Sequence, residues 1–527
     1  MKRRDFLKGA VPASALPFLI SGFSVKAYGR SPFLDALVAS ATATDRVLVL
    51  VQLNGGNDGL NTVIPLDQYS ALAAARSNIF VDAAKVLKLT NATGLHPAMT
   101  GLQSLYSNGK LAVVQSVGYP NPNFSHFRAT DIWLTGSDSN QVLSSGWMGR
   151  YLNEEFPDYP NGYPSAVMPD PLAIQIGSVV SSGLEGPSVS MGLAITDPNA
   201  TYILPGGSDT PPNTPAGHEL TFIRQVAQQT QQYSAGIKTA SGKASNKSTL
   251  YPAQGQNSVA DQLKIVARLV AGGLKTRIYM VNIGGFDTHS AQVVSGATET
   301  GTHATLLGRL SVAITAFQDD LQLLGVEDRV IGMTFSEFGR RIKSNASFGT
   351  DHGTAAPLFV FGSSANPGIL GANPVLPANP TVNDNILMQY DFRWVYSSVL
   401  KDWFGASQIE LQNVLFNNTQ TLPIIKPSAV TAAQDTRALP AEFALYQNYP
   451  NPFNPSTQIR YDLSRGAYVT LEVYNSAGQR VTVLVSGEQT AGEHQVTFDG
   501  RGLASGAYLY RLQAGDFIST KKLLLLR

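Results

Sequence analysis

The feature that most constrains the fold is a continuous apolar run at residues 47–53, Val-Leu-Val-Leu-Val-Gln-Leu. A strand without alternating polar residues is buried on both faces, as at the centre of a parallel sheet. Further apolar runs follow at 111–117, 277–283, 329–335 and 358–361. The chain is therefore expected to contain one large sheet whose central strands are covered on both sides.

Helical periodicity precedes three of these runs, at 97–107, 259–271 and about 303–324. Strands that alternate with helices predict an α/β domain, with a mostly parallel sheet and helices on both faces. The stretch 205–257 is rich in proline, glycine, serine, asparagine and glutamine. That composition predicts a mobile surface insertion with one helix at about 219–235.

Composition narrows the possible functions. The 527 residues are 43% hydrophobic and 14% charged, which is enough apolar material for a large core and more than one domain. The net charge of +1 gives no electrostatic basis for binding nucleic acid or an anionic membrane. Because the chain has no cysteine, disulfides, zinc–thiolate sites and a cysteine nucleophile are excluded.

The N-terminus has the form of an export signal. Arg3 and Arg4 precede Asp-Phe-Leu-Lys and a mildly apolar stretch, and Val25 and Ala27 have the spacing of a cleavage site. The apolar stretch is too short and too interrupted by proline to cross a bilayer, so no transmembrane span is expected. Residues 1–27 resemble a twin-arginine signal peptide, which implies the twin-arginine translocase as a partner and transit through the periplasm. An ordinary basic amphipathic N-terminus is the alternative.

The C-terminal segment predicts a separate β-rich module. Residues 427–440 have the small, polar composition of a linker, and 441–527 contain short runs of alternating apolar residues between turns. This pattern predicts a small immunoglobulin-like sandwich. The motifs Asn448-Tyr-Pro-Asn-Pro-Phe-Asn-Pro455 and Gly506-Ala-Tyr-Leu-Tyr-Arg-Leu512 resemble the type A sorting domain of type IX secretion. That resemblance implies the type IX secretion machinery as a partner and a final place at the cell surface or outside the cell. The alternative is a generic carbohydrate-binding or spacer module.

Polar residues follow the strands of the predicted α/β domain, residues 28–426. Ligands of open α/β sheets gather beyond the carboxyl ends of the strands, so side chains that follow successive strands can converge on one site. In chain order the candidate site residues are Asp58, Ser125, Arg128, Asp287, His289, His303, Glu337, Arg340, Asp351 and His352.

Histidine and carboxylate at short spacing are ligands for a divalent metal. Asp287-x-His289 can aim both side chains at one ion, with His303 as a third ligand, and a second ion is expected at Asp351-His352, completed by Asp58. Two such ions clamp the attacking and leaving oxygens of an in-line displacement. The predicted ligand set is Asp58, Asp287, His289, His303, Glu337, Asp351 and His352, for zinc, manganese, calcium or magnesium.

Ser125 begins a helix-like stretch whose first N–H groups favour an anion such as phosphate. A metal-activated Ser125 hydroxyl is the expected nucleophile, and Arg128 and Arg340 are expected to clamp a substrate anion. These residues also have structural alternatives. A serine at a helix start is an N-cap first, an aspartate among glycines is most often a turn residue, and Glu337 with Arg340 suits a helical ion pair. Asp287 could cap the helix that follows it, and a lone histidine on a helix, such as His303, is more often structural.

The order Asp58, Ser125, Asp287 with His289, then Asp351-His352 resembles the alkaline phosphatase superfamily. More closely, residues 47–362 resemble the family called domain of unknown function 1501. The motifs that carry this resemblance are Leu53-Asn-Gly-Gly-Asn-Asp-Gly-Leu60, Ser125-His-Phe-Arg128, Gly284-Gly-Phe-Asp-Thr-His-Ser290, Ser336-Glu-Phe-Gly-Arg340 and Thr350-Asp-His-Gly353. The resemblance implies an alkaline phosphatase-like fold and an ester hydrolase.

The chain departs from the superfamily pattern in two places. No histidine follows Asp351-His352 until His494, which lies in the C-terminal module, and the Asp287-x-His289 spacing is tighter than usual. Ser125-His-Phe-Arg128 also lacks the motif that a formylglycine sulfatase requires. The sequence predicts an exported metal-dependent hydrolase of phosphate or sulfate esters. The alternative is a non-catalytic surface protein, built on a degenerate hydrolase domain, that binds polysaccharide or envelope material.

Overall fold

The computed structural model of the chain describes residues 18–20, 23–25, 45–157, 159–200, 212, 214–427, 442–448, 451–489 and 492–526. Of the expected signal peptide it describes only two short strands, β1 (Phe18–Ile20) and β2 (Phe23–Val25), which pair antiparallel. The twin-arginine motif and nearly all of the expected linker lie outside the described residues, so both remain predictions. In the described part of the chain no helix is both long and apolar enough to cross a membrane.

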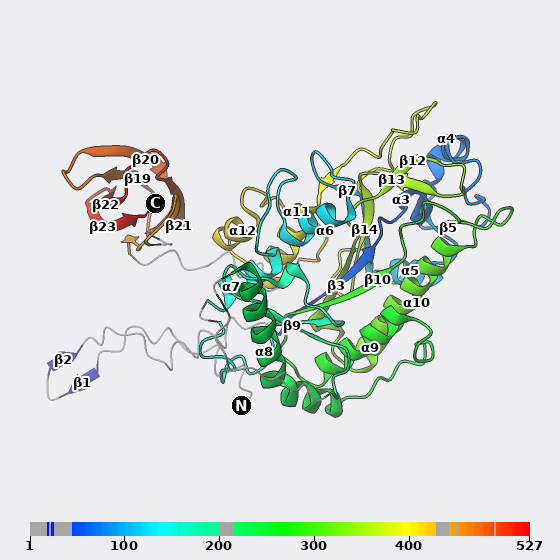
Figure 1. The fold of residues 1–527 in the computed structure, drawn as a ribbon, viewed down its shortest axis with the longest axis horizontal. Helices are drawn as coiled ribbons and strands as arrows, with labels where there is room; N and C mark the ends of the chain where they lie inside the picture. The colour runs from blue at the N-terminus through cyan, green and yellow to red at the C-terminus, as the bar shows by residue number, and fades with distance from the viewer. Residues whose placement is uncertain are drawn as a thin grey trace.

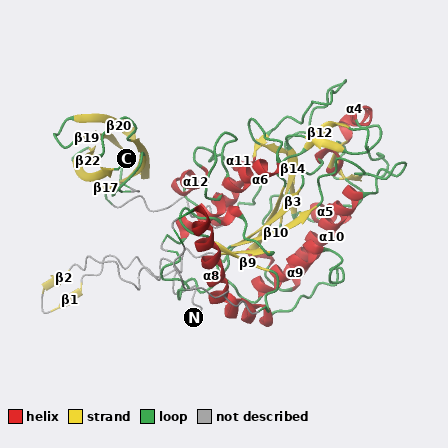
Figure 2. Ribbon diagram, viewed as in Figure 1, coloured by secondary structure: helices red, strands yellow, loops and turns green. Residues whose placement is uncertain are grey.

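A nine-stranded sheet runs through the α/β part of the chain (Figures 1 and 2). Its strands are β3 (Val47–Asn54), β7 (Leu111–Gly118), β8 (Ala173–Ile176), β9 (Gly192–Ile195), β10 (Ile278–Gly284), β11 (Val330–Phe335), β14 (Ala356–Phe361), β15 (Gly368–Leu370) and β16 (Tyr390–Asp391). The order is β15-β7-β14-β11-β3-β10-β8-β9, with β16 beside β7.

Strand direction in this sheet is mostly parallel, as predicted. Strands β11, β3, β10, β8 and β9 are parallel neighbours. Strand β14 is antiparallel to both β11 and β7, so β7 runs in the same direction as β11. The five apolar runs of the sequence correspond to β3, β7, β10, β11 and β14. Strands β8 and β9 were not predicted, because each has only four residues.

Helices cover both faces of the sheet, because β3 has apolar side chains on both. Leu48 and Leu50 pack with α6, α7, α11 and α12, whereas Val49 and Val51 pack with α5, α8, α9 and α10. Figure 1 shows the two helical layers on either side of β3 and β10. Their bounds are α5 (Thr100–Ser107), α6 (His126–Thr135), α7 (Trp147–Glu155), α8 (Pro215–Lys243), α9 (Ser258–Ala271), α10 (Thr302–Leu323), α11 (Phe392–Ser398), the π-helix η5 (Val399–Phe404) and α12 (Gln408–Leu415).

Helix α8 is longer than the helix expected at about 219–235, and it is not all surface insertion. Its C-terminal half contributes the buried side chains of Tyr233, Ile237 and Ala240 to the core that contains α9. This half of the predicted insertion is therefore part of the domain. The polar composition misled the prediction because only a few residues in this half are apolar, and they lie at helical spacing.

Several short helices and strands lie at the edge of the sheet where the parallel strands end. A three-stranded sheet has the order β4-β6-β5, and β12 and β13 form an antiparallel hairpin. These elements are α3 (Gly59–Thr62), β4 (Val63–Pro65), η2 (Leu66–Gln68), α4 (Tyr69–Ala75), β5 (Leu87–Lys88), β6 (Thr93–Leu95), β12 (Arg340–Ser344) and β13 (Thr350–His352). Two further turns of 3₁₀-helix are η3 (Ser182–Leu184) and η4 (Glu327–Arg329).

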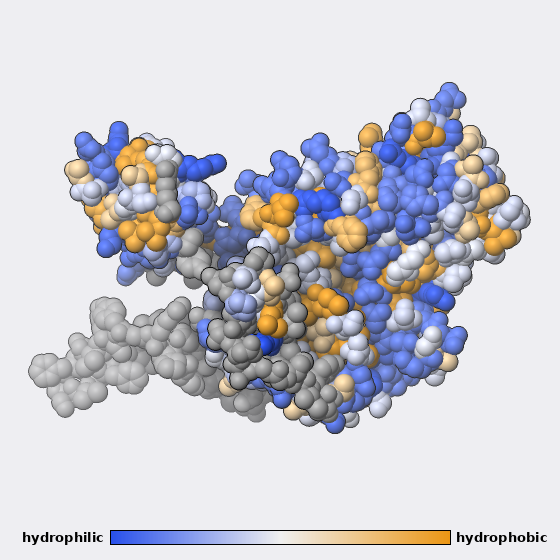
Figure 3. Space-filling model, in the orientation of Figure 1, coloured by the Kyte–Doolittle hydropathy of each residue, from blue (hydrophilic) through white to orange (hydrophobic). Residues whose placement is uncertain are grey.

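The C-terminal residues form two antiparallel sheets around one apolar core, as the alternating pattern predicted. One sheet has the order β17-β18-β21 and the other β20-β19-β22-β23. The strands are β17 (Ala444–Leu445), β18 (Ser456–Leu463), β19 (Ala467–Tyr474), β20 (Arg480–Gln489), β21 (Gly492–Asp499), β22 (Gly506–Ala514) and β23 (Phe517–Leu525). Hydrophilic residues cover most of the face of the α/β part seen in Figure 3, with apolar residues in small separate groups.

A buried arginine joins the loops that follow the central strands. Arg340, at the start of β12, donates from Nε to the carbonyl of Gly56 (2.7 Å) and from Nη1 to that of Thr350 (2.8 Å). Its Nη2 donates to the carbonyls of Gly55 and Phe286. Four backbone carbonyls from three separate segments thus depend on one fully buried guanidinium.

Arg340→Met is expected to lower the free energy of unfolding by at least about 3 kcal/mol, because it leaves several buried carbonyls without donors. Arg341→Met is the matched control. Its guanidinium donates to the Asn383 carbonyl and lies over the Phe124 ring, at a partly exposed position. A loss within about 1 kcal/mol is therefore expected for the control. Urea unfolding curves of the two variants check this, and equal losses would contradict it.

Candidate functional site

The parallel strands bring three loops to one edge of the sheet. Asn54 at the end of β3 pairs with Gly284 at the end of β10, and Phe335 of β11 pairs with Gln52 of β3. The residues that follow these strands therefore meet at the same edge. Strand β7 runs in the same direction and leads at this edge into α6, which begins at His126. The hairpin β12–β13 closes the group.

Two glycines allow these loops to touch. Gly55 has φ +120°, and a Cβ there would lie 2.3 Å from the backbone nitrogen of Asp287. Gly56 has φ +80°, and a Cβ there would lie 2.3 Å from the Phe338 ring. Any side chain at either position would push the loops apart, which explains Asn-Gly-Gly directly after the first strand.

Three imidazoles converge on the carboxylate of Asp287. Nε2 of His126 lies 3.4 Å from Oδ2, and Nε2 of His289 and of His352 each lie 3.2 Å from Oδ1. The Nε2 atoms of His289 and His352 are 2.8 Å apart. Potential ligand atoms of His126, Asp287 and His352 all lie within 4.8 Å of one another. His126, Asp287 and His352 could therefore hold one ion, and His289 lies beside them against Oδ1 of Asp287.

The other ring nitrogen of each histidine faces an oxygen acceptor. His126 Nδ1 lies 2.8 Å from Oε1 of Glu337, and His289 Nδ1 lies 3.1 Å from Oδ1 of Asp351. His352 Nδ1 lies 2.8 Å from the backbone carbonyl of Phe124. A carbonyl or carboxylate oxygen can accept a hydrogen bond from Nδ1, and this tautomer leaves the Nε2 lone pair free for a metal ion. All three Nε2 atoms face Asp287, and Nε2 of His352 lies within hydrogen-bonding distance (3.2 Å) of its Oδ1.

This arrangement fits a divalent transition metal. Burial lowers the pKa of His352, which favours the neutral ring with a free lone pair. Burial raises the pKa of Asp287, but hydrogen bonds from Arg340 and His352 outweigh it and bring that pKa to about 2. With the hydrogens on Nδ1, the Nε2 lone pairs of His289 and His352, 2.8 Å apart beside a carboxylate, repel one another unless a cation lies between them. Imidazoles that donate their second N–H to an oxygen are typical of metal ligands.

Glu337 and Asp351 contact the Nδ1 side of His126 and His289 rather than the Nε2 side that faces Asp287. Glu337 is buried, and its Oε1 accepts from the backbone nitrogen of Gly55 (2.8 Å) as well as facing His126. Asp351 is exposed and accepts from Asn345 (3.2 Å) besides His289. Burial raises the pKa of Asp351, but the His289 contact outweighs it and lowers the pKa. Both were predicted as ligands.

Asp58 and His303 lie elsewhere, which corrects the prediction of a second ion. Asp58 is completely buried, and both its oxygens lie 2.7 Å from Nη1 of Arg76. Gln292 donates to it at 2.6 Å. His303 is buried beside Asn57, with Nε2 3.0 Å from Oδ1, and burial lowers its pKa to about 4. Both side chains belong to a buried polar cluster, and neither is a ligand of the Asp287 site.

The two arginines predicted to clamp a substrate anion are engaged by the protein. Arg340 uses Nη2 to bind Oδ1 of Asp287 (2.7 Å) in addition to the carbonyls described above. Arg128 pairs with Asp131 and donates to the carbonyls of Asp138 and Ser139 (3.2 Å each). Arg340 therefore positions Asp287, and Arg128 holds the loop that follows α6.

Ser125 precedes His126 and is exposed at the N-cap position of α6. Its side chain makes no capping hydrogen bond, and its backbone nitrogen donates to Oδ1 of Asn123 (2.8 Å). The capping alternative therefore does not describe it. His126 is the site residue that the sequence prediction missed. The available signal was a histidine in the first helical turn after a strand end, beside the serine and arginine that were chosen instead.

A pocket of about 450 Å³ opens onto this cluster. It is lined by Asn54, Gly55, His126, Phe127, Thr130, Asp131, Ser182, Asp287 and Glu337. Its floor consists of the strand-end loops, and one wall is the first turns of α6. Pockets of this size usually hold small organic ligands.

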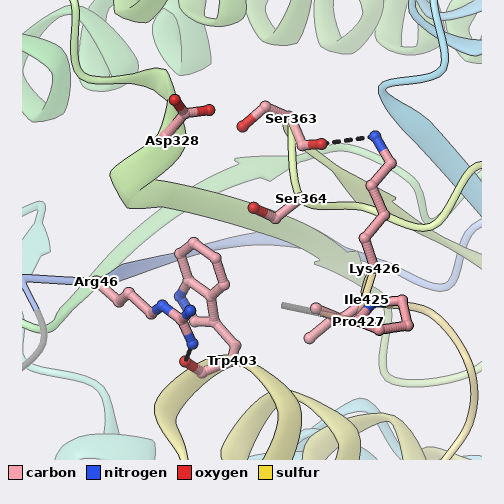
Figure 4. Close-up of a pocket in the computed structure, with 8 residues that line it drawn as sticks. All are labelled: Arg46, Asp328, Ser363, Ser364, Trp403, Ile425, Lys426 and Pro427. Atoms are coloured by element: carbon pink, nitrogen blue, oxygen red, sulfur yellow. Dashed lines mark hydrogen bonds between the residues drawn. The ribbon is translucent and has the colours of Figure 1, made fainter. Parts of the chain in front are cut away.

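A second hollow of about 200 Å³ lies at the opposite edge of the sheet, where β3 and β11 begin (Figure 4). There Arg46 donates to the carbonyl of Trp403 (2.5 Å), and Lys426 donates to the carbonyl of Ser363 (2.7 Å). Its described lining contains one carboxylate, Asp328, and no histidine. The pocket at Asp287 is therefore the candidate site.

No curated protein matches the chain. Among solved structures, residues of this chain resemble part of the dimeric latent PorU from Porphyromonas gingivalis, with 19% identity and a TM-score of 0.14 over 16% of this chain and 9% of PorU. The chain thus spans less than a tenth of that protein. A protein in the alkaline phosphatase superfamily from Vibrio parahaemolyticus is 10% identical, with a TM-score of 0.34, over 90% of this chain and 83% of its own. The PsFucS1 sulfatase from Pseudoalteromonas sp. is 8% identical, with a TM-score of 0.32, over 89% and 86%.

Two segments match protein families. Residues 214–393, which contain Asp287, His289, Arg340 and His352, match the family described as protein of unknown function DUF1501. Residues 447–526 match the family described as secretion system C-terminal sorting domain, which indicates export to the cell surface or the extracellular space. Residues 214–393 are therefore similar to the DUF1501 family, and residues 447–526 to secretion sorting domains.

Proposed function

We propose that the chain is an exported hydrolase of phosphate or sulfate esters, which works with one divalent metal ion held by His126, Asp287, His289 and His352. The observation that carries the proposal is the shared orientation of the three imidazoles. Each has Nδ1 against an oxygen acceptor and Nε2 toward Asp287. Three nitrogen donors favour zinc over manganese, calcium and magnesium, which prefer oxygen ligands.

The chain's own residues account for the remaining requirements of ester hydrolysis. A bound divalent ion supplies a Lewis acid for the ester oxygen on which negative charge develops. Arg340 keeps Asp287 ionised, and Glu337 and Asp351 hold His126 and His289 in their orientations. The exposed Ser125 hydroxyl is the proposed nucleophile. The free N–H groups of the first turn of α6 favour the anionic group of the substrate.

The export part of the proposal rests on the match of residues 447–526 to a secretion sorting domain. In this proposal a twin-arginine signal takes the chain across the inner membrane into the periplasm. The type IX machinery then takes it to the cell surface or the medium. The substrate is an anionic ester found outside the cell, such as a group on envelope material or polysaccharide.

Full-length protein isolated without chelators is expected to retain close to one equivalent of a transition metal, as measured by inductively coupled plasma mass spectrometry. His126→Ala and His352→Ala are each expected to weaken metal affinity at least tenfold, since each removes a ligand. His494→Ala is the matched control, because His494 stacks on Tyr461 in the sorting domain. Less than about 0.2 equivalents in the unaltered chain would count decisively against the metal centre.

Metal-loaded protein is expected to hydrolyse at least one member of a panel of aryl phosphate, phosphodiester and aryl sulfate esters. Ser125→Ala and Asp287→Asn are expected to lower kcat/KM by about 100-fold or more, while His494→Ala leaves it unchanged. Activity that survives in both site variants would refute the residue assignment. Full metal loading without turnover of any ester would instead support a non-catalytic binding protein, a reading that the burial of Asp58 against Arg76 favours.

A further inference from the structure

The pocket at Asp287 is larger than the metal centre requires. Its lining contains His126 and Asp287, and in addition Phe127, Thr130 and Ser182, which are not part of the proposed metal centre. A volume of about 450 Å³ leaves room for an organic group attached to a phosphate or sulfate. The side chains beyond the metal ligands therefore decide which organic group fits.

Phe127 is the large apolar side chain among the described residues that line this pocket. It follows His126 in the first turn of α6, and 91% of its surface is exposed. Single exposed apolar residues are ordinary on protein surfaces. Phe127 differs because its ring stands at a concave site, one residue from a proposed metal ligand. The ring contributes little to the core, so folding gives no reason for a phenylalanine here.

Two other residues that line the pocket carry hydroxyl groups and so add polar contacts beside the Phe127 ring. Thr130 lies one helical turn after His126 on α6, and Ser182 lies on η3, which contacts α6. Their hydroxyls make no hydrogen bond within the described part of the chain, so both are available to a ligand. Asp131 is already paired with Arg128.

We infer that Phe127 is a specificity-determining residue, which selects esters whose organic group has a flat apolar face next to the anionic group. This inference rests on the proposed function for the position of the anion. An aryl ring and the apolar face of a sugar ring share this chemistry. The hydroxyls of Thr130 and Ser182 would add hydrogen bonds only for the sugar.

Calorimetric titration of the metal-loaded full chain tests this without requiring turnover. The probes are methylphosphonate, phenylphosphonate and a phosphonate analogue of glucose 6-phosphate. At least one ring-bearing probe is expected to bind about fivefold or more tighter than methylphosphonate, because it buries apolar surface against the Phe127 ring. Phe127→Ala is expected to abolish this advantage while leaving the affinity for methylphosphonate unchanged.

Two further variants make the outcome specific. Phe416→Ala is the matched control, since Phe416 is also exposed (40%) but does not line the pocket, and it is expected to keep the ring advantage. If the natural organic group is a sugar, Thr130→Val is expected to weaken binding of the sugar probe alone. If it is an aryl group, Thr130→Val is expected to leave binding of both ring-bearing probes unchanged.

The inference is overturned if no probe binds, if no ring probe is preferred, or if the preference survives in Phe127→Ala. Ring preference in a protein that hydrolyses no ester would remove the proposed function and leave Phe127 as a binding residue. If the protein hydrolyses an ester but Phe127→Ala does not change the ring preference, the proposed function stands and the role of Phe127 is refuted.

Discussion

The candidate site depends on the buried guanidinium of Arg340. It accepts no hydrogen bond and offers five N–H donors in a plane, and the fold places carbonyls of Gly55, Gly56, Phe286 and Thr350 around it. The same group binds Asp287. The loops can approach this closely only because residues 55 and 56 are glycines. One side chain thus sets both the spacing of the loops and the charge of the central carboxylate.

Around this centre, each histidine ring is held by an acceptor that comes from another segment of the chain. His126 comes from α6 and is oriented by Glu337, which follows β11. His352 comes from β13 and is oriented by the carbonyl of Phe124. Because each acceptor lies on a different segment from the histidine that it orients, the site does not rely on any one loop. Such outer contacts fix the tautomer and ring orientation of metal-binding histidines.

The five strands with apolar runs were predictable from sequence because strands buried on both faces are continuous apolar runs. Asp287 and His289 were chosen because they follow a strand end, and His352 because it stands beside Asp351 in a glycine turn. Asp58 also follows a strand end, yet it forms an ion pair with Arg76 and accepts a hydrogen bond from Gln292. Local sequence does not reveal that these partners lie beside it. Arg340 was predicted to bind a substrate anion because its sequence neighbours do not show its partners. Only the fold shows that its N–H groups donate to backbone carbonyls. His126 was passed over because its role comes from Glu337, 211 positions away.

The long separation between contacting residues has a consequence for how the site forms. Gly55 and Glu337 are 282 positions apart, and Gly55 and Arg340 are 285 apart. Contacts this distant in sequence form late, after the intervening chain is made and the loops between them are closed. The N-terminus leaves the ribosome long before these pairs can meet. A chain exported unfolded would assemble its metal ligands only after crossing the membrane, whereas a chain exported folded would carry a finished site with it.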